Sequence, residues 1–170
     1  MSDGERRKVV VRPIEEREWP AVCEIVRAVV ADGRTYAYPE DLDDAGARAI
    51  WEEPAPGATV VAAEDGAVLG TAKMGPNRPG RGDHVATGSV MVAPGHEGRG
   101  VGRALGEAVI AWGRAERYRG IQFNAVVATN ERALALWRAL GFEVAGRVPG
   151  AYRHREQGLV DLLVMYLALS

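Results

Sequence analysis

The sequence predicts one α/β (α+β) domain, with a mixed, mostly antiparallel sheet of about seven strands and helices on both faces. Three observations lead to this prediction. The chain has 170 residues, of which 47% are hydrophobic and 26% charged, as expected of one folded domain. No repeat, low-complexity tract or linker divides it. Its apolar patterns give mostly strands first, and then strand, helix, strand, helix and strand in alternation.

The first half of the chain carries three expected strands and two expected helices. Apolar residues recur at steps of three and four from Trp19 onward, which predicts a helix that Gly33 ends. A second helix is expected over residues 42–51, before a break at residues 53–57. Asp65-Gly66 lies between two apolar runs and is a strong hairpin signal. The expected strands are residues 9–14, 59–63 and 68–74.

The second half begins with a loop rich in Gly, Pro, Asn and Arg at residues 75–83. A helix is expected to start near Gly100, and Asn130 is a suitable cap for another helix that Gly141 ends. Residues 150–155 are interpreted as a polar loop. The expected strands are residues 84–92, 121–128, 142–148 and 159–167.

Composition narrows the functional classes. The formal net charge of −2 and the pI of about 6.0 argue against general nucleic-acid binding. The single cysteine and the three scattered histidines give no metal-ligand spacing, so no metal is expected. Residues 1–8 form a polar tail that does not resemble a signal peptide, and no run approaches the roughly 18 apolar residues of a membrane span. We therefore expect a cytoplasmic protein without membrane contacts.

A glycine-rich turn between an expected strand and an expected helix is the most informative feature. Gly98, Gly100 and Gly102 allow close backbone approach to a ligand, and the N–H groups of a helix start favour an anion. Arg99 and Arg103 add charge-assisted donors. The spacing matches neither the dinucleotide fingerprint nor the P-loop. A glycine-rich connection without a ligand is the alternative interpretation.

Two motifs lie at the starts of the last two expected helices. The first is Val92-x-Pro94 followed by Gly98-Arg-Gly-Val-Gly-Arg-Ala-Leu105, and the second is Asn130-x-x-Ala133-x-x-x-Trp137-x-x-x-Gly141-Phe142. They resemble motif A and motif B of the GNAT superfamily of N-acetyltransferases. The resemblance implies a GNAT domain over residues 9–170 and acetyl-CoA as cosubstrate. The contacts that it implies for acetyl-CoA are Met91, Val92, Glu97, Gly98, Arg99, Gly100, Val101, Gly102, Arg103, Asn130 and Trp137.

The motifs also depart from the family pattern. Glu97 stands where Arg or Gln is usual, but that position mainly contributes its backbone. Trp137 replaces the tyrosine that often protonates the departing thiolate, and an indole N–H is a donor without useful acidity. The general acid is therefore open.

The acceptor is expected to be a small amino-acid-like amine. Residues 75–86 and 122–130 resemble the fungal proline-analogue N-acetyltransferases, in which the position of Asn124 lies in the substrate region. Asn124 interrupts an apolar run, so it is either a structural tie or a ligand contact. Thr35 and Tyr36 occupy the region that covers the acceptor site in the family.

The expected reaction is direct attack of the amine on the thioester. The resemblance implies that a backbone N–H near Met91 and Val92 polarises the carbonyl. His84 is a candidate base and Tyr152 a candidate acid, although a solvated histidine and an uncatalysed proton exchange with solvent are the plainer alternatives. A catalytically weak acyl-CoA-binding sensor or partner subunit is the alternative function. The resemblance also allows a homodimer, formed at the exposed end of the sheet.

Overall fold

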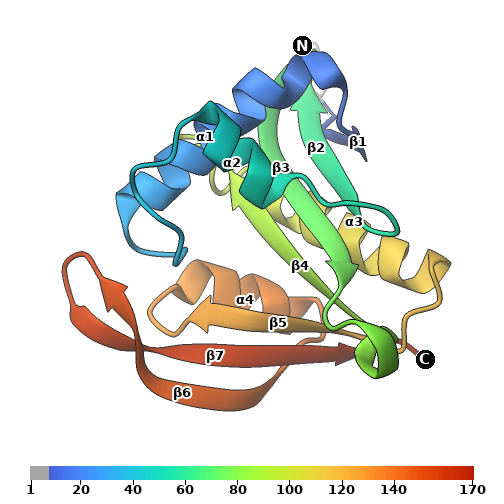
Figure 1. Cartoon of the computed structure of the whole chain (residues 1–170), viewed down its shortest axis with the longest axis vertical. Coiled ribbons are helices and arrows are strands. Elements are labelled where there is room, and N and C mark those ends of the chain that lie inside the picture. Colours follow the sequence, from blue (N-terminus) through green and yellow to red (C-terminus); the bar gives the residue numbers. More distant parts are fainter. Residues whose placement is uncertain (1–7) are drawn as a thin grey trace, which may run out of the picture.

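The computed structural model describes residues 8–170, which form one seven-stranded sheet with helices on both faces (Figure 1). Residues 1–7 of the expected N-terminal tail lie outside the described residues. The strands are β1 (Val10–Pro13), β2 (Ala58–Glu64), β3 (Ala67–Pro76), β4 (Val85–Val92), β5 (Gly120–Val127), β6 (Glu143–His154) and β7 (Gly158–Ala168). The α-helices are α1 (Trp19–Asp32), α2 (Asp44–Trp51), α3 (Val101–Ala115) and α4 (Glu131–Ala139).

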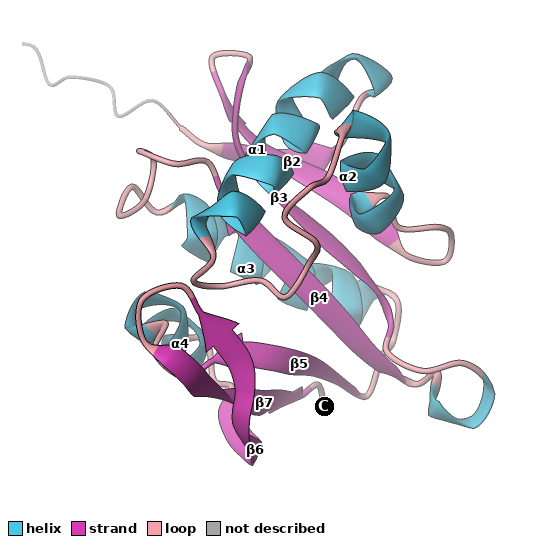
Figure 2. Cartoon of the chain, turned by 60° about the vertical axis from the view of Figure 1, so that its left-hand side comes forward, coloured by secondary structure: helices cyan, strands magenta, loops and turns pink. Residues whose placement is uncertain are grey.

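The order of strands in the sheet is β1-β2-β3-β4-β5-β7-β6, and only β4 and β5 pair in parallel. Two separate apolar clusters fix the helices to its two faces. Residues of α1 and α2 pack on one face with Val61 and Met91, whereas residues of α3 and α4 pack on the other. Figure 2 shows α1 and α2 together in front of the sheet and α3 behind it. The predicted mixed sheet with helices on both faces is confirmed.

The turn and cap signals of the sequence are found where they were expected. Asp65 and Gly66 have φ angles of 49° and 81° and join β2 to β3. Gly33 ends α1 at a φ of 71°, and the Asn130 side chain accepts the Ala133 N–H at the start of α4. Short side chains or glycine are needed at each of these positions, which is why the sequence reveals them.

The polar loop expected at residues 150–155 is wrong. Residues 150–154 belong to β6, where Tyr152 and His154 are buried and Arg153 between them is exposed, and Arg155 begins the turn that follows. His154 Nδ1 accepts the N–H groups of Glu156 and Gln157 at 3.2 Å and so holds the hairpin. Charged residues at the outward positions and a register shift between Val148 and Tyr152 conceal the two-residue period of this strand.

None of the helices formed by residues 8–170 is long and apolar enough to span a bilayer. Within the same residues, no group of three or more His, Cys, Asp or Glu side chains is arranged to hold a metal ion.

Candidate active site

The site lies where β4 and β5 separate. The two strands pair only at Val85 with Gly120 and Ala86 with Ile121, and beyond these residues they diverge (Figure 2). β5 then shifts register against β7 between Phe123 and Val126. The backbone edge of β4 therefore faces an opening in the middle of the sheet, where polar groups of a ligand can pair with it.

Two cavities meet at this opening. The first, which we call the turn cavity, has a volume of about 520 Å³ and lies against the glycine-rich turn. The second, which we call the polar cavity, has a volume of about 360 Å³ and lies between the sheet and the α1–α2 loop. The residues that line both are Thr35, Tyr36, Val90, Asn130, Ala133 and Trp137. A molecule bound in the turn cavity can thus present one end to a molecule bound in the polar cavity.

The glycine-rich turn has the backbone geometry of an anion site. Gly98 and Gly100 have φ angles of 75° and 84°, and a Cβ at either position would meet no atom within 4 Å. Gly100 is the N-cap of α3, and no side chain among the described residues caps this helix. The first N–H groups of α3 and the positive end of its dipole therefore face open space that a diphosphate can fill.

The charged side chains around this turn divide into two groups. Glu97 and Arg103 line the turn cavity, and the Glu97 carboxylate also accepts the Gly95 N–H at 2.9 Å. Arg99, by contrast, does not line it, because its guanidinium donates to Glu64 at 2.8 Å. Arg99 is thus held against the β2–β3 hairpin by Glu64, whose side chain is 13% exposed, compared with 45% for Arg99.

The backbone of β4 supplies donors toward the opening. The Tyr36 hydroxyl donates to the Val90 carbonyl at 2.6 Å and accepts the Val90 N–H at 3.1 Å. The Ala93 N–H donates to Leu69 of β3, so the alternation of the strand directs the Val92 N–H to the opposite edge, that of Val90. Met91 and Val92 both line the turn cavity, but by the same alternation the Met91 N–H faces β3.

Motif B contributes a cap and an aromatic wall. Asn130 caps α4 and lines both cavities. Trp137 packs against Phe123 and Phe142, with ring centroids 4.6 and 5.8 Å away, and is 7% exposed. Gly102 lines the turn cavity, whereas the Val101 side chain is buried beneath α3. Trp137 therefore lines both cavities and also forms part of the hydrophobic core.

The residues expected on the acceptor side are brought together, with one exception. Thr35, Tyr36, Asn124 and Tyr152 all line the polar cavity. Asn124 lies at the register shift of β5, where its amide donates to Asn77 Oδ1 at 2.6 Å. His84 is exposed in the turn before β4 and lines neither cavity among the described residues.

Tyr36, at the junction of the cavities, contacts Tyr152 of the polar cavity. The Tyr152 hydroxyl donates to the Tyr36 carbonyl at 3.4 Å, so β6 contacts the α1–α2 loop directly. Burial raises the pKa of both Tyr36 and Tyr152, although the hydrogen bonds to Val90 and Tyr36 partly oppose the effect. Both side chains are therefore neutral hydrogen-bond donors at pH 7.

Sequence reasoning missed two charged residues of the polar cavity, Glu53 and Lys73. Lys73 interrupts the apolar strand β3, which is the same signal that singled out Asn124 in β5. Glu53 precedes a proline in the segment that was interpreted only as a helix break. No local pattern gives the position of Glu53, because the tertiary fold brings its segment to the sheet.

Comparison with known proteins identifies the family. The model of the Acetyltransferase (GNAT) family matches residues 15–142, which is most of the chain. None of the curated proteins compared matches the sequence. A GCN5-related N-acetyltransferase from Kribbella flavida is 49% identical, with a TM-score of 0.92 over 95% of this chain and 98% of that one.

Two further solved structures extend the comparison. A ribosomal-protein-alanine N-acetyltransferase from Brucella melitensis is 29% identical, with a TM-score of 0.82 over 94% of this chain and 99% of that one. A phosphinothricin acetyltransferase from Sinorhizobium meliloti, in complex with AcCoA, is 23% identical and has the same fold, with a TM-score of 0.85 over 95% of this chain and 89% of that one. With motif A forming the turn cavity and motif B its wall, this chain belongs to the GNAT family of acetyltransferases.

Proposed function

We propose that this chain transfers an acetyl group from acetyl-CoA to the amine of a small amino-acid-like acceptor by direct attack. The observation that carries the proposal is the meeting of the turn cavity and the polar cavity at Tyr36 and Val90. A donor with a phosphate-bearing part at the turn can extend along the edge of β4 to this junction. An acceptor in the polar cavity then meets its reactive end.

The glycine-rich turn supports acetyl-CoA as the donor. The N–H groups at the start of α3 suit a diphosphate, and Glu97, Gly98, Gly100, Gly102 and Arg103 line the cavity there. Arg99 would join them only after leaving Glu64. The related fold from Sinorhizobium meliloti was solved in complex with AcCoA, which agrees with this donor.

The closure of the polar cavity supports a small acceptor. The Tyr152 hydroxyl of β6 donates to the Tyr36 carbonyl of the α1–α2 loop at 3.4 Å, and both residues line this cavity. This contact bridges one side of the cavity, whose volume of about 360 Å³ lies near the lower end for ligand sites. The Brucella relative is named for a ribosomal-protein acceptor, but a polypeptide would need that side to be open.

We assign the remaining roles as follows. The Val92 N–H polarises the thioester carbonyl, which can contribute about 3 kcal/mol to transition-state stabilisation. Tyr152 protonates the departing thiolate, since Trp137 has no acidic proton to give. Asn124 and Thr35 orient the acceptor, and Tyr36 fixes the edge of β4 through Val90. His84 lies outside both cavities and has no role in the proposal.

The donor site is tested by Gly100→Glu, with Gly80→Glu as a matched control. Both glycines have a positive φ, 84° and 59°, and open space around the Cβ position, so the two variants share backbone strain and added charge. Only Gly100 lines the turn cavity. We expect calorimetry to show loss of acetyl-CoA binding for Gly100→Glu alone, with both variants folded. Equal affinity of the two variants would refute the assigned diphosphate site.

The reaction is tested by measuring free thiol when the protein meets acetyl-CoA and a panel of amino acids, imino acids and polyamines. We expect thiol release with at least one acceptor of the panel. Tight binding of acetyl-CoA without turnover on any acceptor would instead favour a sensor or partner subunit.

A further inference from the structure

The polar cavity holds one positive and one negative side chain. Among the described residues that line it, only Lys73 and Glu53 are charged, and the other polar groups are hydroxyls and amides. The cavity is therefore neutral overall but polarised. Such a charge pattern complements a molecule that carries one charge of each sign more closely than it does a dication or a dicarboxylate.

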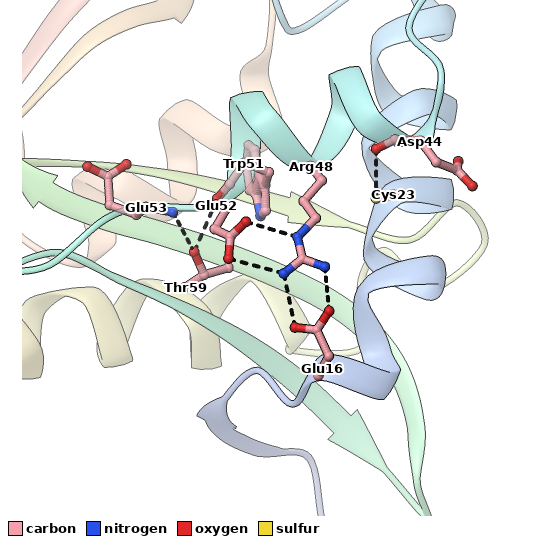
Figure 3. Close-up of polar contacts among 8 residues, drawn as sticks. All are labelled: Glu16, Cys23, Asp44, Arg48, Trp51, Glu52, Glu53 and Thr59. Carbon is pink, nitrogen blue, oxygen red and sulfur yellow. Dashed lines mark hydrogen bonds and ion pairs between the residues drawn. The ribbon is translucent and has the colours of Figure 1, made fainter.

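Glu53 is held in place by its backbone and by two glycines. Its N–H donates to Thr59 Oγ1 at 3.0 Å, and this hydroxyl donates to the Trp51 carbonyl (Figure 3). A Cβ on Gly75 would lie 2.5 Å from Glu53 Oε1, and one on Gly57 would overlap the Glu53 side chain. The Glu53 side chain thus lies directly against the backbone of Gly57 and Gly75. A larger residue at either glycine would occupy the space that Glu53 now fills.

The neighbouring Glu52 shows that this placement is specific. Figure 3 shows Glu52 turned to Arg48, in the network that also includes Glu16, whereas the Glu53 carboxylate points away from that network. The Glu53 side chain is 24% exposed. Among the described residues it accepts no hydrogen bond and has a single ion-pair partner, Lys73. Its lone pairs are therefore available to a ligand.

Lys73 is also fixed by a hydrogen bond and also has hydrogen-bonding capacity left for a ligand. Its ammonium donates to the Ile50 carbonyl at 2.7 Å, but it lies 3.9 Å from Glu53 Oε2, beyond hydrogen-bond distance. The Arg12–Glu18 ion pair, by contrast, is in direct contact at 2.6 Å. Burial lowers the pKa of Lys73, and the charge of Glu53 partly restores it. Two of the three ammonium donors of Lys73 remain for a ligand.

We propose that Lys73 binds the carboxylate of a free amino acid and that Glu53 accepts the proton of its ammonium group, so that the acceptor is a zwitterionic amino acid with an unmodified carboxylate. This inference rests on the proposed function and names its acceptor class. Glu53 then acts as the general base of the reaction.

The proton balance of the reaction follows from these roles. The ammonium gives one proton to Glu53, and the nitrogen lone pair forms the new C–N bond at the thioester carbonyl carbon. The C–S bond breaks and its electron pair leaves with the sulfur. Tyr152 protonates the thiolate and is reprotonated by the second proton of the nitrogen, while Glu53 releases its proton to solvent. Each turnover therefore yields one amide, one thiol and one free proton.

The carboxylate is tested with matched acceptors, each amino acid against its carboxamide, for example L-alanine and L-alaninamide or L-proline and L-prolinamide. We expect the wild-type protein to prefer the acid by about 10-fold or more in kcat/KM, in line with one buried ion pair. Lys73→Met should abolish this preference, and Lys73→Arg should restore part of it. Equal use of acid and carboxamide by the wild-type protein would overturn the assignment of Lys73.

The base is tested by Glu53→Gln, with Glu52→Gln as the matched control. We expect Glu53→Gln to lower kcat by about 100-fold or more at pH 7 and to leave acetyl-CoA affinity unchanged. Its rate should recover as the pH approaches the pKa of the acceptor amine, because solvent then removes the proton. The titratable groups that face Glu53 are Lys73, Tyr38 and, more distantly, Tyr118, and burial raises the pKa of both tyrosines.

The outcomes separate this inference from the proposed function. Turnover by Glu53→Gln at the rate of Glu52→Gln would overturn the role of Glu53 and leave the acetyltransferase intact. Absence of turnover by the wild-type protein on every acceptor would overturn the proposed function itself. In that case, calorimetry of L-alanine and L-alaninamide with the CoA-loaded protein still tests the charge pair, and equal affinities would overturn it.

Discussion

Replacing Thr71 by Val should destabilise the domain through a single buried hydrogen-bond network. Thr71 lies on β3 and is 0% exposed. Its hydroxyl accepts the Trp51 indole N–H at 2.9 Å and donates to the Val60 carbonyl at 2.8 Å. Valine has the same branched shape as threonine, so the substitution removes both hydrogen bonds while it keeps the packing. The buried indole N–H of Trp51 is then left without an acceptor.

The magnitude follows from these contacts. A buried donor without a partner costs about 1–3 kcal/mol, and the added methyl group recovers about 0.8 kcal/mol. We therefore expect a net loss of about 0.2–2.2 kcal/mol in the free energy of unfolding. For a chain of 170 residues this corresponds to a fall in Tm of up to about 9 °C.

Urea denaturation measures this loss, and Thr129→Val is the matched control. Thr129 Oγ1 is also buried but has no hydrogen-bond partner among the described residues, so its replacement should be neutral or stabilising. Trp51→Phe, alone and combined with Thr71→Val, gives the coupling energy of the pair. Equal stability of Thr71→Val and Thr129→Val, at unchanged m-value, would refute the reasoning.

Two further predictions concern the position of α3 and the response to acid. A Cβ on Gly70 would lie 2.9 Å from the Met91 carbonyl and 2.9 Å from Val101 Cγ1. Gly70→Ala should therefore displace the start of α3 and weaken acetyl-CoA binding, as measured by calorimetry. Unchanged affinity for acetyl-CoA would contradict this prediction. Hydrogen bonds from Arg12 lower the pKa of Glu18 in the folded state, so Glu18 stabilises the fold at neutral pH and loses this effect as the pH falls through that lowered pKa. Glu18→Gln should therefore cost about 1–2 kcal/mol in urea denaturation at pH 7 and progressively less below about pH 4, and a constant difference at every pH contradicts it.

The parts of the fold that could be predicted from sequence are those with local causes. Asp65-Gly66, Gly33, Asn130 and Gly141 mark turns and helix ends because the backbone there requires residues with particular φ angles or short polar side chains. Residues 150–155 show the limit of this reasoning. Their charges resemble those of a loop, and only the packing of Tyr152 and His154 against the rest of the fold reveals the strand.

The turn cavity was predictable for the same reason, since one contiguous segment, residues 92–103, provides the glycine turn and the start of α3. The side chain of Arg99 could not be placed, because its partner Glu64 lies 35 residues away in the β2–β3 hairpin. The role expected for His84 rested on chemistry alone. The residue type shows only that the side chain can titrate, and does not show how far along β4 it lies from the junction of the cavities.

The polar cavity differs in kind from the turn cavity, and this difference bears on the specificity for the acceptor. Its charged residues come from β3 and from the segment after α2, and its covering residues come from the α1–α2 loop and β6. In the proposed function, backbone amides hold the donor, so most side-chain changes leave the donor site intact. The proposed acceptor site, by contrast, depends on individual side chains such as Lys73 and Glu53, supported by Gly75 and Gly57. One substitution among these four residues can change the acceptor while donor binding persists, which is why family membership alone does not identify the acceptor.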